Sequence, residues 1–135
     1  MSDSIERLRE RGRNEPIASF LEMKLLELSE GFARVSMKMK PEYLNFNGTV
    51  FGGIISAVAD QAFAYATNSV ATPNVASQFN IHFLSAVKAQ DVLIAECRVL
   101  KPGRRICISE IKVINQENKV VAIATGTTVP IPNGL

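Results

Sequence analysis

One long helical segment is the strongest constraint on the fold of this chain. From residue 52 to about residue 70, apolar residues, many of them alanines, recur every three or four positions. They are Ile54, Ile55, Val58, Ala59, Ala62, Phe63 and Ala66. So broad an apolar surface predicts a helix buried inside the domain, and the rest of the chain must then enclose it.

The segments on both sides of this helix have the two-residue alternation that is typical of strands. Two strands, residues 23–29 and 32–40, are predicted before the helix, with the turn at Glu30-Gly31. Four more are predicted after it, at residues 75–85, 92–100, 105–115 and 120–129. The turns are too short for parallel crossovers, so we expect one antiparallel sheet wrapped around the helix. A slip in the apolar alternation within residues 106–113 predicts a bulge or burial on both faces.

The length and composition fit one domain. The chain has 135 residues, of which 47% are hydrophobic and 21% charged. Its apolar runs fall short of the roughly 20 residues of a membrane-spanning helix, and its first twenty residues do not resemble a signal peptide. We expect a single cytoplasmic domain over residues 1–135 that does not enter the membrane. Residues 1–13, dense in charge, are expected to form a poorly packed extension.

The charge pattern and the cysteines argue against two classes of ligand. The net charge is only +2 and the basic residues are interleaved with acidic ones, which disfavours a nucleic-acid partner. Cys97, Cys107 and the single histidine, His82, cannot complete a tetrahedral metal site, so no metal is expected. Both cysteines are expected to be reduced and buried. A disulfide between them is the alternative, because the predicted hairpin turn could bring them opposite one another.

The entrance to the long helix combines a polar loop with two glycines. Gly52 and Gly53 leave the first backbone N–H groups of the helix uncovered, at the positive end of its dipole. Such amides can stabilise an oxygen that gains negative charge during a reaction. The alternative to a binding role is that the two glycines only allow the loop to pack tightly against the sheet.

Asp60 is an acidic residue inside this otherwise apolar helix. It follows Ala59 and precedes Ala62, a setting in which burial without a partner is costly. A partly desolvated carboxylate is a candidate general base or nucleophile. The alternative is a carboxylate on the wet side of the helix, paired with Gln61 or Ser56.

The spacing of these residues resembles the phenylacetate-degradation (PaaI-like) branch of the hotdog thioesterase superfamily. In that branch an Asn lies six residues before a His-Gly-Gly, and an Asp follows nine residues after the His. Asn45, Phe51-Gly52-Gly53 and Asp60 keep that spacing. Residues 30–36 and 59–66 also resemble a strand and the helix of the family, and the resemblance runs from about residue 14 to residue 129.

The resemblance implies an α+β hotdog fold, in which an antiparallel sheet of five to six strands wraps around one long central helix. It also implies a homodimer formed by joining two sheets edge to edge, and commonly a tetramer made of two such dimers. The implied activity is hydrolysis of aryl-acetyl or medium-chain acyl-CoA, without a cofactor, because coenzyme A is part of the substrate. The Gly52 amide would polarise the thioester carbonyl, and Asn45 would position that carbonyl or the attacking water. Asp60 of the other subunit would activate the water or attack directly.

Phe51 departs from the family, which usually has His at this position. Phenylalanine can neither donate a hydrogen bond nor shuttle a proton, so we expect Phe51, together with Gly53, to contact the substrate. This departure keeps open a second hypothesis, a non-catalytic hotdog protein that binds acyl-CoA. Hydratase chemistry on the same fold needs an Asp and a His together, and His82 is poorly placed for that role.

Two further sets of residues are predicted from the resemblance. Ser77, on the strand after the helix, is a candidate catalytic residue, or only a small strand residue. Lys101, Arg104 and Arg105 flank a hairpin turn and are expected to bind the phosphates of coenzyme A. A merely solvated basic turn is the alternative for these three cations.

Overall fold

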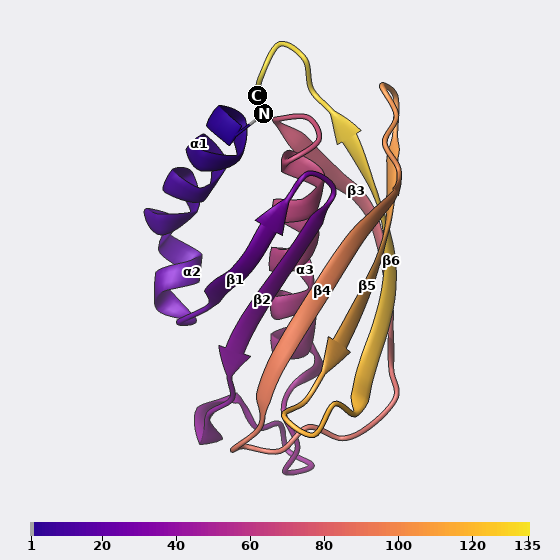
Figure 1. The fold of residues 1–135 in the computed structure, drawn as a ribbon. Helices are drawn as coiled ribbons and strands as arrows, with labels where there is room; N and C mark the ends of the chain where they lie inside the picture. Colours follow the sequence, from indigo (N-terminus) through magenta and orange to yellow (C-terminus); the bar gives the residue numbers. More distant parts are fainter. Residues whose placement is uncertain (1) are drawn as a thin grey trace.

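The computed structural model describes residues 2–135, and in it one long helix lies in the curve of an antiparallel sheet (Figure 1). The elements follow in the order α1 (Ser2–Arg13), α2 (Pro16–Phe20), β1 (Lys24–Ser29), β2 (Phe32–Lys38), the 3-10 turn η1 (Pro41–Tyr43), α3 (Gly52–Asn68), β3 (Asn74–Phe83), β4 (Val92–Lys101), β5 (Cys107–Ile114) and β6 (Val120–Pro130). The predicted sheet around a single buried helix is confirmed. Within residues 2–135, no helix is both long enough and apolar enough to cross a membrane.

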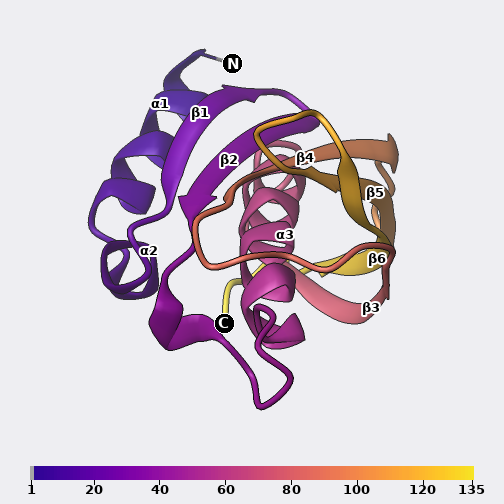
Figure 2. The same cartoon turned by 90° about the horizontal axis from the view of Figure 1, so that it is seen from below.

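The sheet has six strands in the order β1-β2-β4-β5-β6-β3, and every neighbouring pair is antiparallel. Figure 2 shows this sheet curving around α3, with α1 and α2 beside β1. The strand that directly follows α3 in the chain, β3, pairs with β6 at one edge of the sheet. Its other side has no strand partner among the described residues, so β3 is an open edge.

The helix α3 approaches the sheet closely because small residues line its buried side. Ala59, Ala62 and Ala66 are fully buried, and the Phe63 ring fills the space between helix and sheet. Gly126 on β6 lies directly against that ring, so a methyl group at this glycine would overlap Phe63. The alanine-rich pattern of the sequence thus corresponds to close packing of helix on sheet.

The ends of several elements differ from the sequence prediction by one or two residues. The helix ends at Asn68, because the Asn68 side chain donates to the carbonyls of Ala64 and Asn74 and so caps the last turn. The bulge predicted within residues 106–113 does not lie in β5 itself, where the core-facing residues alternate regularly. The register shifts lie opposite β5 on its two neighbours, at Leu100 of β4 and at Val121 of β6.

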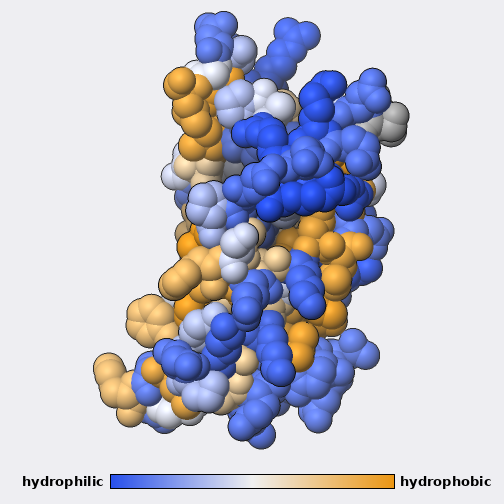
Figure 3. Space-filling view, turned by 90° about the vertical axis from the view of Figure 1, so that its left-hand side faces the viewer, coloured by the Kyte–Doolittle hydropathy of each residue, from blue (hydrophilic) through white to orange (hydrophobic). Residues whose placement is uncertain are grey.

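The N-terminal segment packs more closely than its charge indicated. Residues 2–13 form α1, and Ile5 and Leu8 of this helix pack against the core, while Met1 lies outside the described residues. Gly12 lies so close to Tyr65 of α3 that a methyl group there would overlap the Tyr65 hydroxyl. On the face seen in Figure 3, mostly hydrophilic surface covers the upper half, where α1 lies, and apolar patches interrupt it below.

Both cysteines are free and buried, as the sequence predicted. Cys97 pairs across the β4–β5 ladder with Ile111, four residues beyond Cys107. At about 3.3 Å per residue the two cysteines are roughly 13 Å apart along the ladder, too far for a disulfide. Burial raises the pKa of the Cys97 thiol to about 12.

Candidate active site

The first turn of α3 has unpaired backbone donors. Phe51 is the N-cap residue, its side chain makes no cap, and its carbonyl accepts a hydrogen bond from the Ile54 N–H at 2.9 Å. Within residues 2–135, the N–H groups of Gly52 and Gly53 have no hydrogen-bond acceptor. Because the positive end of the helix dipole lies here, these two amides favour a negatively charged oxygen.

Two phenylalanine rings lie against the glycine pair. A methyl group at Gly52 would lie 3.1 Å from Cζ of Phe83, the last residue of β3. A methyl group at Gly53 would lie 2.6 Å from Cε2 of Phe51. An apolar ring therefore lies beside each of the two unpaired amides. Neither glycine can gain a side chain unless its neighbouring ring moves.

Asn45 holds the loop in front of the helix and leaves one donor available. Its Oδ1 accepts the N–H groups of Asn47 at 2.9 Å and Thr49 at 3.3 Å, so the free hydrogen-bonding group of the side chain is the Nδ2 amide. Asn45 and Gly52 both line a hollow of about 370 Å³. The other residues that line it are Thr49, Val50, Ile55, Phe83, Leu84, Ser85, Ala86 and Val87. The predicted pair Asn45 and Gly52 thus meets in one hollow.

Asp60 lies on the exposed side of α3, in a stripe of small residues that includes Gly53 and Ala64. Among the described residues its carboxylate has no hydrogen-bond or ion-pair partner, and Gln61 donates to Glu15 instead. Partial burial raises the pKa of the Asp60 carboxyl, and the charge of Glu15 raises it further. Asp60 is thus on the exposed side of the helix, as the alternative had it, but among the described residues it pairs with neither Gln61 nor Ser56.

Within one chain, Asp60 does not meet Asn45 and Gly52. It follows Gly52 by eight residues on the same helix, which separates the two by about 12 Å along the axis. Asp60 is also absent from the lining of the hollow beside Gly52. A thioester carbonyl bound at the Gly52 amide is therefore out of reach of the Asp60 of the same chain.

The remaining predicted residues lie apart from this hollow. Ser77 is exposed at a register shift in β3, and its hydroxyl donates to the Thr127 carbonyl at 3.4 Å. Lys101, Arg104 and Arg105 are exposed at the β4–β5 turn, and Arg104 lines a hollow together with residues 70–73, the segment that follows α3. The 17 residues of α3 span roughly 25 Å, so this basic turn lies at the opposite end of the domain from Gly52.

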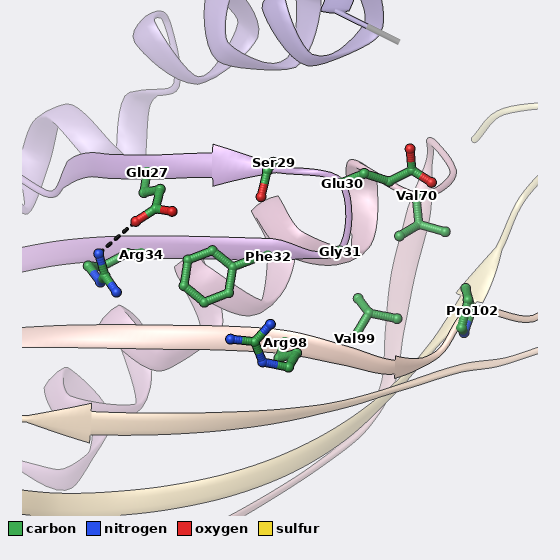
Figure 4. A pocket seen from close by; sticks show the side chains of 10 residues that line it. All are labelled: Glu27, Ser29, Glu30, Gly31, Phe32, Arg34, Val70, Arg98, Val99 and Pro102. Atoms are coloured by element: carbon green, nitrogen blue, oxygen red, sulfur yellow. Dashed lines mark hydrogen bonds and ion pairs between the residues drawn. The ribbon is translucent and has the colours of Figure 1, made fainter.

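Figure 4 shows a separate hollow of about 580 Å³ on the outer face of β1, β2 and β4. The guanidinium groups of Arg34 and Arg98 lie over the Phe32 ring, at 5.5 and 4.9 Å from its centre. Arg34 also pairs with Glu27 at 2.6 Å and with Glu96 at 2.7 Å. These side chains form a network of ion pairs and cation–π contacts between neighbouring strands, in which Arg34 is already paired with two carboxylates. The hollow is therefore not a candidate catalytic site.

Sequence reasoning missed two residues that the fold brings to the candidate site. Phe83 covers Gly52, although the two are separated by the whole of α3 and β3. Glu15 lies beside Gln61 on α3, at a hydrogen-bond distance of 2.6 Å. The sequence signals were weak, an apolar residue at the end of a strand and an acidic residue before Pro16.

Comparison with known proteins places this site in a family. The family model described as the thioesterase superfamily matches residues 47–122, more than half of the chain, including the glycine pair and Asp60. The chain belongs to the thioesterase superfamily. The expected enzyme class, a thioester hydrolase, is thereby confirmed at the level of the family.

Individual relatives of this thioesterase-superfamily member agree with the predicted branch. It is 36% identical over 113 residues to acyl-coenzyme A thioesterase PaaI of Escherichia coli, covering 84% of this chain and 81% of that protein. The structure of the E. coli PaaI protein from the phenylacetic acid degradation operon matches with a TM-score of 0.91 and 33% identity, covering 96% and 95% of the two chains. The predicted hotdog fold and PaaI-like resemblance are confirmed.

A third comparison involves a structure with a ligand. A Streptococcus mutans protein bound to acetyl CoA matches with a TM-score of 0.76 and 27% identity, covering 79% of this chain and 86% of that one. The fold of this thioesterase-superfamily member is thus also that of a CoA-binding protein.

Proposed function

We propose that this protein is an acyl-CoA thioesterase that acts on aryl-acetyl or medium-chain acyl groups. The observation that carries the proposal is the pair of unpaired amides at Gly52 and Gly53, on the helix that also bears the unpaired carboxylate of Asp60. The similarity to PaaI and to a protein bound to acetyl CoA supports coenzyme A as the thiol half of the substrate.

The proposed reaction uses the amides for the carbonyl and the carboxylate for water. The thioester carbonyl oxygen accepts a hydrogen bond from the Gly52 N–H, which stabilises the oxyanion as it forms. Asn45 Nδ2 positions the carbonyl or the attacking water. Asp60 takes a proton from that water, which attacks the carbonyl carbon, and the C–S bond then breaks. Alternatively Asp60 attacks the carbon itself with loss of the thiolate, and water then hydrolyses the mixed anhydride and restores the carboxylate. The thiolate leaves without prior protonation, because a free thiol has a pKa near 8.5.

We propose that Asp60 comes from the second subunit of a homodimer. The separation of about 12 Å along α3 prevents one chain from supplying both groups. The open edge β3 offers a surface for pairing: it has no charged residue over ten positions, and most of its residues are exposed. Natural proteins usually protect such an edge with charges, so an unprotected one favours pairing with another strand.

Antiparallel pairing of two β3 edges would also explain the basic turn. The twofold axis inverts the partner, so its β4–β5 turn lies at the end of the dimer where Gly52 of the first subunit lies. Lys101, Arg104 and Arg105 of the partner would then bind the phosphates of coenzyme A. The rings of Phe51 and Phe83 beside the glycine pair favour an apolar acyl group.

Release of free thiol from a panel of acyl-CoA substrates tests the activity. Wild-type protein is expected to hydrolyse aryl-acetyl or medium-chain acyl-CoA, and Asp60→Asn and Asp60→Ala are expected to lower kcat by about 100- to 10,000-fold. A matched control is Asp3→Asn on α1, far from the glycine pair in sequence, which should keep wild-type activity. Wild-type dimer that releases no thiol above background from the whole panel would exclude this function.

Subunit mixing tests the shared site. Asn45→Ala and Asp60→Asn are each expected to be nearly inactive, but co-expression gives mixed dimers in which one site has neither substitution. Random mixing would restore about one quarter of wild-type activity, because half of the dimers are mixed and half of their sites are intact. If both groups acted within one chain, mixing would restore nothing.

Phe51 favours a second candidate function, binding of acyl-CoA without hydrolysis. With phenylalanine in place of the usual histidine, none of the described residues that line the hollow beside Gly52 has an acidic, basic or imidazole side chain that could donate a proton. Isothermal titration with an acyl-CoA separates the two functions. The binding protein would give saturable binding in wild type and in Asp60→Ala, and thiol release in neither.

A further inference from the structure

Glu15 lies at the junction of α1 and α2, where its backbone is fixed from both sides. Its N–H donates to the Gly12 carbonyl and its own carbonyl accepts the Ser19 N–H, both at 3.2 Å. Although Glu15 is the N-cap residue of α2, its side chain makes no capping hydrogen bond. The carboxylate is therefore free to extend away from α2.

The Glu15 carboxylate reaches the helix that bears Asp60. Its Oε1 accepts a hydrogen bond from Nε2 of the buried Gln61 at 2.6 Å. Glu15, Gln61 and Ala64 line one cavity of about 350 Å³ between the N-terminal helices and α3. Asp60 immediately precedes Gln61 and lies one helical turn before Ala64, so the Glu15 carboxylate is beside the turn that bears Asp60.

We propose that Glu15 is a positioning residue for Asp60, which fixes this turn of α3 through Gln61 and keeps a second negative charge beside the Asp60 carboxyl. This inference rests on the proposed function, in which Asp60 is the base or nucleophile. A charge of the same sign disfavours ionisation of a carboxyl, which makes the ionised form a stronger base. The N-terminal helices thereby take part in the chemistry of α3.

The charged groups around this cavity support the assignment to Glu15. Burial is the larger cause of the raised pKa of Asp60, and Glu15 is the charged group that adds to it. On α1, Arg9 acts on the Tyr65 hydroxyl, lowering a pKa that burial and Glu15 raise, and Arg11 lines the cavity. Among the described residues, no lysine, arginine or histidine has a resolved effect on Asp60.

The pH dependence of hydrolysis in Glu15→Gln tests the role of the charge. Glutamine removes the charge but keeps a carbonyl oxygen that can accept the Gln61 hydrogen bond. The acidic limb of the kcat profile should move to lower pH by about half a unit, with KM changed less than kcat. Glu10→Gln, on the exposed side of α1, is the matched control and should leave the limb in place. A limb that does not move in Glu15→Gln would overturn the proposal, even if activity fell.

Direct titration of Asp60 gives the same test without turnover. The Asp side-chain carboxyl carbons of the full chain are followed by ¹³C NMR against pH, and the Asp60 signal is identified by its loss in Asp60→Asn. Its titration midpoint should fall in Glu15→Gln by the same amount as the kinetic limb. If wild type hydrolyses no thioester, the proposed function fails, and the NMR shift still decides whether Glu15 acts on Asp60. An unchanged midpoint would refute that action.

Discussion

The Phe51 ring lies directly over Gly53, so closely that a methyl group at the glycine would be 2.6 Å from Phe51 Cε2. Phe51 is the position at which the chain departs from its family, and among the described residues the backbone N–H of Gly53 has no acceptor. Phe51 is 58% exposed, so its ring has room to move away. The same kind of overlap at Gly126 involves the buried ring of Phe63, which has no such room.

This difference predicts unequal losses of stability in two glycine-to-alanine variants. Gly126→Ala should lower the free energy of unfolding by about 1–3 kcal/mol, because the buried Phe63 ring must leave its rotamer or the helix must shift. Gly53→Ala should change it by less than about 1 kcal/mol, because the exposed Phe51 ring can rotate away. Urea denaturation followed by circular dichroism measures both. Equal losses in the two variants would contradict this account of the packing.

Phe51→His should increase thioester hydrolysis. Histidine restores a hydrogen-bond donor beside the Gly52 amide, and we expect kcat/KM to rise at least about tenfold. Phe46→His is the control, since Phe46 lies in the same loop, is fully exposed and is not in contact with the glycine pair. A similar increase in both variants, or no increase in Phe51→His, would show that the lack of a histidine at position 51 does not limit the rate.

The raised pKa of Asp60 predicts a pH-dependent gain of stability in Asp60→Asn. A carboxyl whose pKa is higher in the folded state binds its proton more tightly there, so its contribution to stability is lost as pH rises through the folded pKa. Asparagine avoids that loss. The thermal midpoint of Asp60→Asn should therefore exceed that of wild type at pH 7 and approach it below pH 4. A difference independent of pH would assign the effect to packing instead.

Charges placed on β3 should break the proposed dimer. Gln78→Lys combined with Asn80→Lys puts like charges on an exposed edge that has none, and these would repel across a twofold axis. Size-exclusion chromatography with light scattering should give the monomer mass of 14.8 kDa, with the circular dichroism spectrum kept and the activity lost. The matched variant on the other edge strand, Leu26→Lys with Ser29→Lys, should remain dimeric. If both variants dimerise, β3 is not the interface.

The Cys97 thiol should be unreactive in the folded protein. Burial raises its pKa to about 12, so the nucleophilic thiolate is scarce at pH 8, and the side chain has no exposed surface. Mass spectrometry after iodoacetamide treatment should find Cys97 unmodified under native conditions and modified in urea. Native labelling as fast as in urea would mean that β4 opens locally.

The sequence by itself determined the elements and the chemical groups of this protein. The three- and four-residue recurrence of alanines predicted a buried α3, and the spacing of Asn45, Gly52 and Asp60 predicted the thioesterase family. These predictions succeed because the period of apolar residues along a segment records which of its faces is buried. The same local information located the unpaired amides at the start of the helix.

Only the tertiary structure decided which of these groups meet. It brought Phe83 onto Gly52 and Glu15 beside the turn that bears Asp60, and it put the basic turn at Arg104 at the far end of α3. It also left β3 as an open edge next to β6. Contacts between distant segments depend on how the sheet curves and on which strands pair, and the periodicity of a single segment carries no record of either.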